Sequence, residues 1–370
     1  AIDVRGPKCW IAGSPGTCVL HSEDAGRNWT TLPTGQNAPI RAITFVDDQH
    51  GWAVGSLGTI LATADGGRSW SVNRAGGNRA AVLVLASEPR DAPWELLARL
   101  AGNEGYLAVV SVINRRDMES ASHPRTAASQ RFHEAALHVG ASDTVAAWQF
   151  PLRQQGLALA GPQVVEEWNR ANDGRGLDVM LDYLVRQIRL WRPEIVVTHD
   201  ASPRGERPRD HLINQVVLEA VRRAVDPTAH IEQITHAGLE PWQVKKVFAF
   251  LPPGTHGSND LATAETAERL GGSLAEVAAD ARALVDDHFD AGPETLGFHL
   301  MVDTLPQEQG RGDFFSGITL QPGGGARRAL DELSPATLAA QRQQAQRRQN
   351  IRAIVRRSEK DPFAGEQWLA

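Results

Sequence analysis

The chain has 370 residues, of which 42% are hydrophobic, so it can bury a large core and we expect more than one domain. Its 38 basic and 44 acidic residues give a net charge of −6, which argues against a nucleic-acid partner or an anionic membrane surface. No apolar run approaches the roughly 18 residues that span a bilayer, so we expect no membrane span. The chain opens on Ala1 without a signal-peptide pattern, which leaves open whether it is a processed product or a fragment.

An internal repeat occupies the N-terminal part of the chain. Residues 10–17 (WIAGSPGT) recur at 52–59 (WAVGSLGT), and residues 22–29 (SEDAGRNW) recur at 63–70 (TADGGRSW). The period of 41 to 42 residues is the length of one four-stranded propeller blade. The repeat therefore predicts two all-β blades over residues 1–75.

The second repeated motif resembles the Asp-box, Ser/Thr-x-Asp-x-Gly-x-x-Trp, of sialidase-like and photosystem-assembly-factor-like propellers. In such a turn Asp24 and Asp65 accept backbone hydrogen bonds, while Trp29 and Trp70 pack between blades, so we expect these four residues to be structural. Two blades cannot close a ring of the usual four to eight. The segment is thus expected to be an incomplete propeller whose other blades lie in another chain or in sequence absent here.

The two cysteines flank the turn at residues 13–16. A disulfide between Cys9 and Cys18 would indicate an oxidising compartment, whereas two reduced thiols in a blade are an equally good interpretation. The register of the two strands decides between them, and the sequence does not determine that register.

Strands and helices alternate after a linker at residues 74–78, which predicts a mostly parallel, Rossmann-like sheet. The predicted strands are 80–86, 106–113, 144–150, 194–198 and 246–251. The predicted helices are 94–101, 126–139, 177–190, 211–225 and 262–287, the last with an interruption at residues 271–272. A further helix at 335–357 carries six arginines and is expected to face solvent or a partner. The predicted domains are therefore the blades at 1–75, an α/β domain at 79–330, and a basic helix and tail at 335–370.

Two segments of the α/β region carry a resemblance to a known family. The run at 80–91 (AAVLVLASEPRD) and the later pair 194–200 (EIVVTHD) and 208–211 (PRDH) resemble motifs of the PIG-L/LmbE-like zinc-dependent N-acetylglucosaminide deacetylases. In that family the first motif is Ala-His-Pro-Asp-Asp-Glu, and the second is His-Pro-Asp-His after a strand ending in Thr-His. The resemblance covers roughly residues 79–330 and implies a zinc site at the carboxyl ends of two strands.

The resemblance assigns roles to individual positions. Asp91 matches the Asp ligand and His211 the later His ligand, while Glu88 stands where the other His ligand belongs. Arg90 stands in place of the general base, and Pro208 in place of the first His of the second motif. The metal set implied by the resemblance is therefore Glu88, Asp91 and His211, in a degenerate form, with no catalytic residue assigned.

Arg90 decides how this degenerate set is interpreted. A guanidinium keeps its charge, cannot take a proton from water and repels a dication, so we expect a vestigial loop in which Arg90 pairs with Glu88 or Asp91. Zinc is then bound weakly or not at all. Arg90, His199 and Asp210 are expected to line a substrate pocket, with His199 lining it rather than ligating a metal.

The favoured interpretation is a deacetylase-fold protein without activity that serves as a glycan-binding or assembly element outside the cytoplasm, at the periplasm or cell surface. One alternative is an active metal-dependent deacetylase of an N-acetyl sugar with a noncanonical site. Another is a structural component of a surface layer or large complex. Bound zinc separates the first two, and size under native conditions identifies the third.

Overall fold

The computed structural model describes residues 1–74, 79–113, 115–116, 128–152, 160–200, 207–286, 292–306, 313–320 and 346. The chain divides into two compact units, 1–320 and 321–370. In the second unit only Gln346 is described, so the basic helix predicted at 335–357 lies outside the described residues apart from this one helical position. No helix among the described residues is long and apolar enough to cross a membrane.

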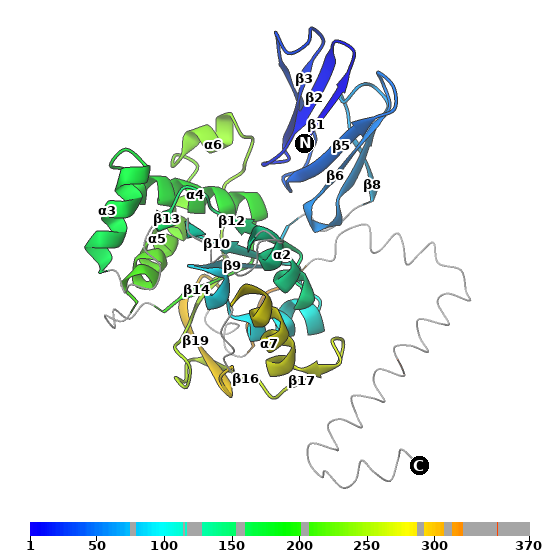
Figure 1. Ribbon diagram of the computed structural model, residues 1–370. Coiled ribbons are helices and arrows are strands. Elements are labelled where there is room, and N and C mark those ends of the chain that lie inside the picture. Colours follow the sequence, from blue (N-terminus) through cyan, green and yellow to red (C-terminus); the bar gives the residue numbers. More distant parts are fainter. Residues whose placement is uncertain are drawn as a thin grey trace. The chain divides into compact units, whose positions relative to one another are not determined.

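The N-terminal part consists of two four-stranded antiparallel sheets, the blades of a partial propeller (Figure 1). The first blade contains β1 (Ile2–Arg5), β2 (Lys8–Ala12), β3 (Cys18–Ser22) and β4 (Thr30–Pro33). The second contains β5 (Ile40–Phe45), β6 (Gly51–Gly55), β7 (Ile60–Thr63) and β8 (Ser71–Arg74). The strands of each blade pair in chain order, as the repeat predicts.

The repeated turns are held by their aspartates. Asp24 Oδ1 accepts the backbone N–H of Asn28 at 2.8 Å, and Asp65 Oδ1 accepts that of Ser69 at 2.9 Å. Hydrogen bonds from the hydroxyl and the backbone N–H of Ser69 lower the pKa of Asp65 to about 2. Both carboxylates therefore have a structural role, which is to hold the backbone of these turns.

Strand register also decides whether Cys9 and Cys18 can form a disulfide. In the β2–β3 pair Cys9 lies opposite Ser22, and Ala12 lies opposite Val19, so Cys9 and Cys18 sit near opposite ends of the ladder. A separation of several residue pairs at about 3.3 Å each is too long for a disulfide. Both cysteines are free thiols.

A seven-stranded sheet forms the centre of the α/β region, and it is mostly parallel as predicted. Its order is β12 (Asp143–Ala146), β10 (Ala108–Val112), β9 (Val82–Ala86), β14 (Ile195–His199), β15 (Lys246–Phe250), β19 (Thr295–Asp303) and β16 (Asn259–Ala262). The first five strands are parallel, and β19 is antiparallel to both of its neighbours. Two short pairs accompany it: β11 (Arg115–Arg116) with β13 (Pro151–Leu152), and β17 (Thr266–Ala267) with β18 (Gly272–Ser273).

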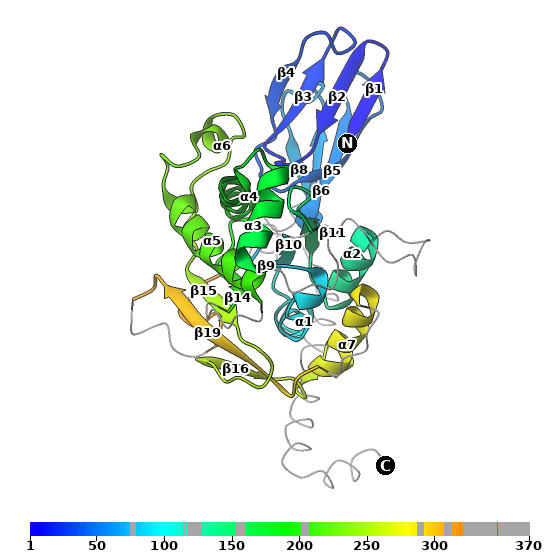
Figure 2. The ribbon, with the colours of Figure 1, turned by 60° about the vertical axis from the view of Figure 1, so that its left-hand side comes forward.

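Helices cover both faces of this sheet (Figure 2). One face carries α1 (Trp94–Leu97), which continues as a π-helical turn over Ala98–Asn103, with α2 (Ala128–His138) and α7 (Leu274–Val285). The other carries α3 (Gly161–Ala171), α4 (Gly176–Trp191) and α5 (Pro208–Val225). A short helix, α6 (Ile231–Thr235), follows α5. Because side chains alternate along a strand, Val82 and Val84 pack into the first core while Leu83 and Leu85 pack into the second.

The helix predicted at 262–287 is wrong in its first half, where the chain forms β17, β18 and their turn. The helix begins only at Leu274, because Ser273 caps it. The Ser273 hydroxyl accepts the N–H of Glu276 at 3.2 Å, and the Glu276 carboxylate accepts the N–H of Ser273 at 2.8 Å. This capping box defines the helix start more strongly than the alanine-rich composition before it.

The strand order determines where a site can form. From β9 the chain moves outward to β10 and β12 on one side of β9, and β14 and β15 lie on its other side. The loops that leave β9 and β14 therefore diverge, and a crevice forms at their carboxyl ends. The segments after these two strands are the two that carry the motifs.

Candidate functional site

The loop after β9 turns two carboxylates into the protein. Ser87 is fully buried, and Pro89–Asp91 form one 3-10 turn. The side chains of Glu88 and Asp91 are only 5% and 6% exposed. Ser87 Oγ donates a hydrogen bond of 2.6 Å to Asp91 Oδ2. Two acidic groups are thus held within a few residues of each other where water does not reach them freely.

Arg209, in the first turn of α5, neutralises these carboxylates. Its guanidinium bonds Glu88 Oε1 through Nη1 and Asp91 Oδ2 through Nη2, the latter at 3.1 Å. Its Nε reaches Asp210 Oδ1 at 3.1 Å. The Arg209 side chain is 15% exposed, so the loop after β9 and the start of α5 are cross-linked by one buried cation.

Two more arginines complete the charge balance at the surface of the site. Arg207 Nη1 lies 3.1 Å from Asp91 Oδ1 and 3.7 Å from Asp210 Oδ2, and Arg90 Nε lies 3.1 Å from Glu88 Oε2. Arg90 thus pairs with Glu88, one of the two partners expected from the sequence. Three carboxylates face three guanidinium groups, so the cluster carries no net formal charge.

The contacts determine the protonation states. Burial by itself raises the pKa of Asp91, but the charge of Arg209, the Ser87 hydrogen bond and the charge of Arg207 outweigh it, and the pKa lies below its usual value. Burial likewise disfavours a charged Arg209, but its carboxylate partners, Glu88 first, raise its pKa. Both groups are therefore charged at neutral pH.

His199, at the end of β14, is a fully buried neutral imidazole. The backbone N–H of Ser87 donates to its Nε2 at 2.7 Å, so Nδ1 carries the proton and faces Asp210 Oδ2 at 3.8 Å. Burial lowers the His199 pKa, which favours the neutral form. Asn214 holds the backbone of His199 through a hydrogen bond of 2.7 Å to its carbonyl. Because the Nε2 lone pair is engaged by Ser87, this nitrogen has none to offer a metal.

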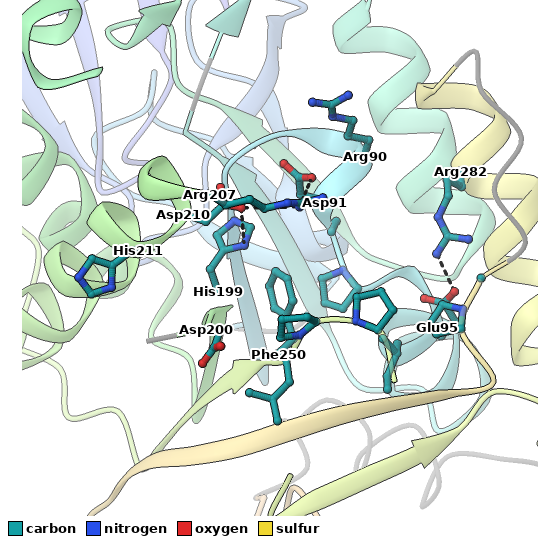
Figure 3. Close-up of a pocket in the computed structure, with 18 residues that line it drawn as sticks. Arg90, Asp91, Glu95, His199, Asp200, Arg207, Asp210, His211, Phe250 and Arg282 are labelled. Carbon is teal, nitrogen blue, oxygen red and sulfur yellow. Dashed lines mark hydrogen bonds and ion pairs between the residues drawn. The ribbon is translucent and has the colours of Figure 1, made fainter. Parts of the chain in front are cut away.

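His211 lies apart from the carboxylates. Figure 3 shows it on α5, away from Asp91, although both residues line the same pocket. The set Glu88, Asp91 and His211 does not converge, and nowhere in the described part of the chain do three His, Cys, Asp or Glu side chains meet as metal ligands.

The donor set does not fit a divalent metal. The space between Glu88, Asp91 and Asp210 holds the Arg209 guanidinium, which has five N–H donors and no lone pair to donate. A dication there would add two charges to a cluster that is already neutral. Glu88 and Asp91 also offer fewer free oxygens, since each accepts bonds from two guanidinium groups.

A pocket of about 360 Å³ opens beside this cluster. Its walls combine Arg90, His199, Asp210 and other polar groups with the apolar residues Phe250, Pro252, Pro253 and Leu296. Arg90, His199 and Asp210, which the sequence predicts at a substrate pocket, are among its lining residues. That the pocket takes a substrate stays a prediction. On the opposite wall Arg282 Nη2 bonds Glu95 Oε1 at 2.6 Å, and the Glu95 side chain is only 1% exposed (Figure 3).

Sequence reasoning missed Arg209, Arg207 and the Glu95–Arg282 pair. Arg209 stands at the Pro position of the second motif, where the pattern of the resembled family has no ligand, so the resemblance predicts no role for Arg209. The signal that was available is charge: Arg207 and Arg209 flank Pro208, and they face a loop that carries Glu88 and Asp91. Glu95 and Arg282 are 187 residues apart, and their pairing has no local sequence signal.

No family model matches the chain. It is 32% identical over 116 residues to the photosystem II assembly lipoprotein Ycf48 of Synechococcus sp. (strain CC9902), covering 31% of this chain and 30% of that protein. The chain therefore spans about a third of the curated relative that it matches.

Two solved structures are similar to part of this chain. The N,N'-diacetylchitobiose deacetylase from Pyrococcus horikoshii has a TM-score of 0.42 and 15% identity, covering 60% of this chain and 84% of that one. The conserved protein TT1542 from Thermus thermophilus has a TM-score of 0.40 and 18% identity, covering 58% and 81%. The α/β architecture of this chain follows from its own strand order and register.

Proposed function

We propose that the α/β domain at residues 79–330 is a deacetylase-fold module that works without a metal and does not hydrolyse N-acetyl sugars. It acts instead as a binding or assembly element. The observation that carries the proposal is the Arg209 guanidinium lying among Glu88, Asp91 and Asp210. A hydrolytic site of this kind needs a metal at that position, and Arg209 occupies the space.

Loss of activity follows from the chemistry of the replacing groups. A metal-dependent amidase must lower the pKa of a bound water and supply a base to take its proton, and base assistance is worth about 10²- to 10⁴-fold in rate. Arg90 and Arg209 stay protonated and cannot act as bases. Asp91 keeps its charge but is bonded by Arg209, Arg207 and Ser87, so it is a poor proton acceptor.

The ligand that suits the pocket is small and polar. Arg90 and Arg207 are 45% and 67% exposed, so each keeps guanidinium N–H groups for a ligand acceptor while holding its carboxylate. Phe250 and the prolines after it give an apolar wall on which a sugar ring can lie. An N-acetyl sugar, with hydroxyl and carbonyl acceptors and one apolar face, is the first candidate.

Two engineered variants test the proposal directly. The first carries Glu88→His, Arg90→Asp and Pro208→His, and the second adds Arg209→Pro to complete the family pattern. We expect zinc binding in the second variant only, because in the first the Arg209 guanidinium still fills the site. Metal analysis of purified protein and a deacetylation assay on N-acetylglucosamine derivatives measure the result.

The unmodified protein is the matched control for both variants. We expect it to bind no stoichiometric zinc, to release no acetate, and to bind N-acetylglucosamine by calorimetry. If it binds one zinc per chain and deacetylates the sugar at an ordinary enzymatic rate, the proposal fails. The alternative of an active deacetylase with a noncanonical site then takes its place.

An assembly role outside the cytoplasm is the second candidate, and the local identity to an assembly lipoprotein favours it. That relative's name describes photosystem II assembly, and for this chain the corresponding role is binding a protein partner. Cell fractionation tests the location. Recovery of the protein in the cytoplasm, with no partner retained after crosslinking, would contradict this candidate.

A further inference from the structure

We propose that acid weakens the contact between the two blades, and that the imidazole of His21 is the group whose protonation weakens it. This inference is independent of the function proposed for the α/β domain. It depends on a stack of three rings between the blades, on a buried ring nitrogen without a partner, and on the different residue that the second blade has at the equivalent position.

The His21 ring is one end of a stack that joins the blades. It lies on the Trp10 ring with centroids 5.0 Å apart and planes 23° apart, and Trp10 lies on Phe45 with centroids 3.9 Å apart. His21 and Trp10 belong to the first blade, and Phe45 belongs to the second. All three rings are buried, and the Trp10 indole N–H donates to the Gly66 carbonyl at 2.9 Å. His21 therefore packs on the ring through which the first blade contacts the second.

One nitrogen of the His21 ring has no partner. Nε2 is buried, and none of the described residues forms a hydrogen bond with it. A neutral imidazole tolerates this arrangement, because it can carry its proton on Nδ1 and leave only a lone pair at Nε2. The charged ring carries a proton on both nitrogens, so Nε2 would become a buried cationic donor without an acceptor, which is costly. Burial accordingly lowers the pKa of His21 below 6.5.

Three charged groups face His21, and together they do not compensate for its burial. Glu23 raises the pKa of His21, whereas Arg68 and Lys8 lower it. Glu23 also pairs with Arg68 at 3.4 Å, where both side chains are exposed, and Lys8 pairs with Asp48 at 2.9 Å. Both ion pairs link the first blade to the second. The charges around His21 are thus held in place by the same contact that its protonation would weaken.

The blade fold does not require a histidine at this position. In the first blade His21 lies opposite Trp10. In the second blade Ala62 lies opposite Trp52, which is the repeat equivalent of Trp10. A second blade of the same design therefore has a small residue that does not titrate. The buried imidazole belongs to this one contact and not to the repeated motif.

The direction of the pH effect follows from proton uptake. While the blades are in contact, burial keeps the pKa of His21 below 6.5. When the blades separate, water reaches both ring nitrogens and the pKa returns toward the ordinary value of 6.5. The separated form then binds a proton that the closed form does not bind. The contact is therefore strongest above about pH 6.5, and it weakens as the pH falls toward the pKa of the closed form.

Hydrogen exchange of the full-length protein measures the opening of the blades. Mass spectrometry follows the peptides that contain β2, β3 and β5, with rates corrected for the intrinsic effect of pH on exchange. Between about pH 7.5 and about pH 5.5 we expect the opening of these strands in the parent to increase by up to about tenfold, the limit for one proton with a reference pKa of 6.5. His21→Phe keeps an aromatic ring on Trp10 and cannot titrate, so its opening should be independent of pH.

Two further variants complete the test. His50→Gln is the matched control, because His50 is another histidine of the blades, but its ring is exposed and pairs with Asp47. It should keep the pH dependence of the parent. His21→Ala places in the first blade the residue that the second blade has, and its opening should also be independent of pH even if the larger ring of His21→Phe is not accommodated. Circular dichroism at neutral pH checks that each variant is folded.

The outcomes separate His21 from the other titratable groups. A pH dependence that is present in the parent and in His50→Gln, and absent from the folded His21 variants, supports the proposal. A parent whose blades open equally at both pH values overturns it. The proposal is also overturned if the His21 variants respond to pH as the parent does, or if His50→Gln loses the response.

Discussion

Replacing Arg209 by alanine is expected to destabilise the protein strongly. The guanidinium binds Glu88, Asp91 and Asp210, whose side chains are at most 8% exposed. Breaking a buried ion pair from one side costs about 3–5 kcal/mol, because the other charge stays buried without its partner. Arg207 remains on Asp91, so we expect the lower end, about 3 kcal/mol, which is roughly a hundredfold in the unfolding equilibrium.

Urea denaturation at neutral pH measures this loss. Arg209→Met keeps most of the side-chain volume and separates the charge from the packing, and it should lose nearly as much stability as Arg209→Ala. The control is Arg223→Ala, which removes another α5 arginine whose bond to Glu219 is exposed, and it should change the midpoint little. Equal midpoints for Arg209→Ala and Arg223→Ala would refute the structural role of Arg209.

A cation titration tests whether Arg209 stands in place of a metal. Without it, three carboxylates have two surface arginines between them, so calcium or zinc should raise the melting temperature of Arg209→Ala and leave the parent unchanged. If the parent gains as much as the variant, the cation binds elsewhere or coexists with Arg209. The argument from the filled site would then be wrong.

Two further predictions concern pH. Because the pKa of Asp91 is below 3.8 in the folded protein, its stabilising contribution is complete above about pH 4 and is lost as the pH falls through the pKa of the folded state. Asp91→Asn should therefore make stability fall less steeply at acid pH. An unchanged acid dependence would contradict this. Because burial lowers the pKa of His199 below 6.5, the unfolded chain takes up that proton first and stability should fall as the pH drops below 6.5. Denaturation midpoints of the parent and His199→Asn check it, since the variant should show a shallower slope there.

The blades and the sheet could be predicted because their signals are local. A repeat of 41 to 42 residues is visible in the letters, and the run from Ala80 to Ala86 is apolar because both faces of β9 are covered. The composition of residues 262–273 wrongly predicted helix there, because the capping box at Ser273 determines where the helix begins. The β19 strand was missed because it pairs antiparallel with strands on both sides and forms no βα unit.

The sequence by itself determined which residue types follow β9 and β14, and so that Glu88 and Arg90 stand where the motif that the chain resembles has a histidine and an aspartate. Only the tertiary structure decided what those residues do. At the start of α5, Arg209 points toward the loop after β9 and bonds Asp91, which is 118 positions earlier in the chain. His211, on the same helix, points away from Asp91 (Figure 3). The orientation of these two side chains depends on how α5 packs on the sheet and on which buried charges pair. Both depend on residues far apart in the sequence, so the local pattern of residues does not predict them.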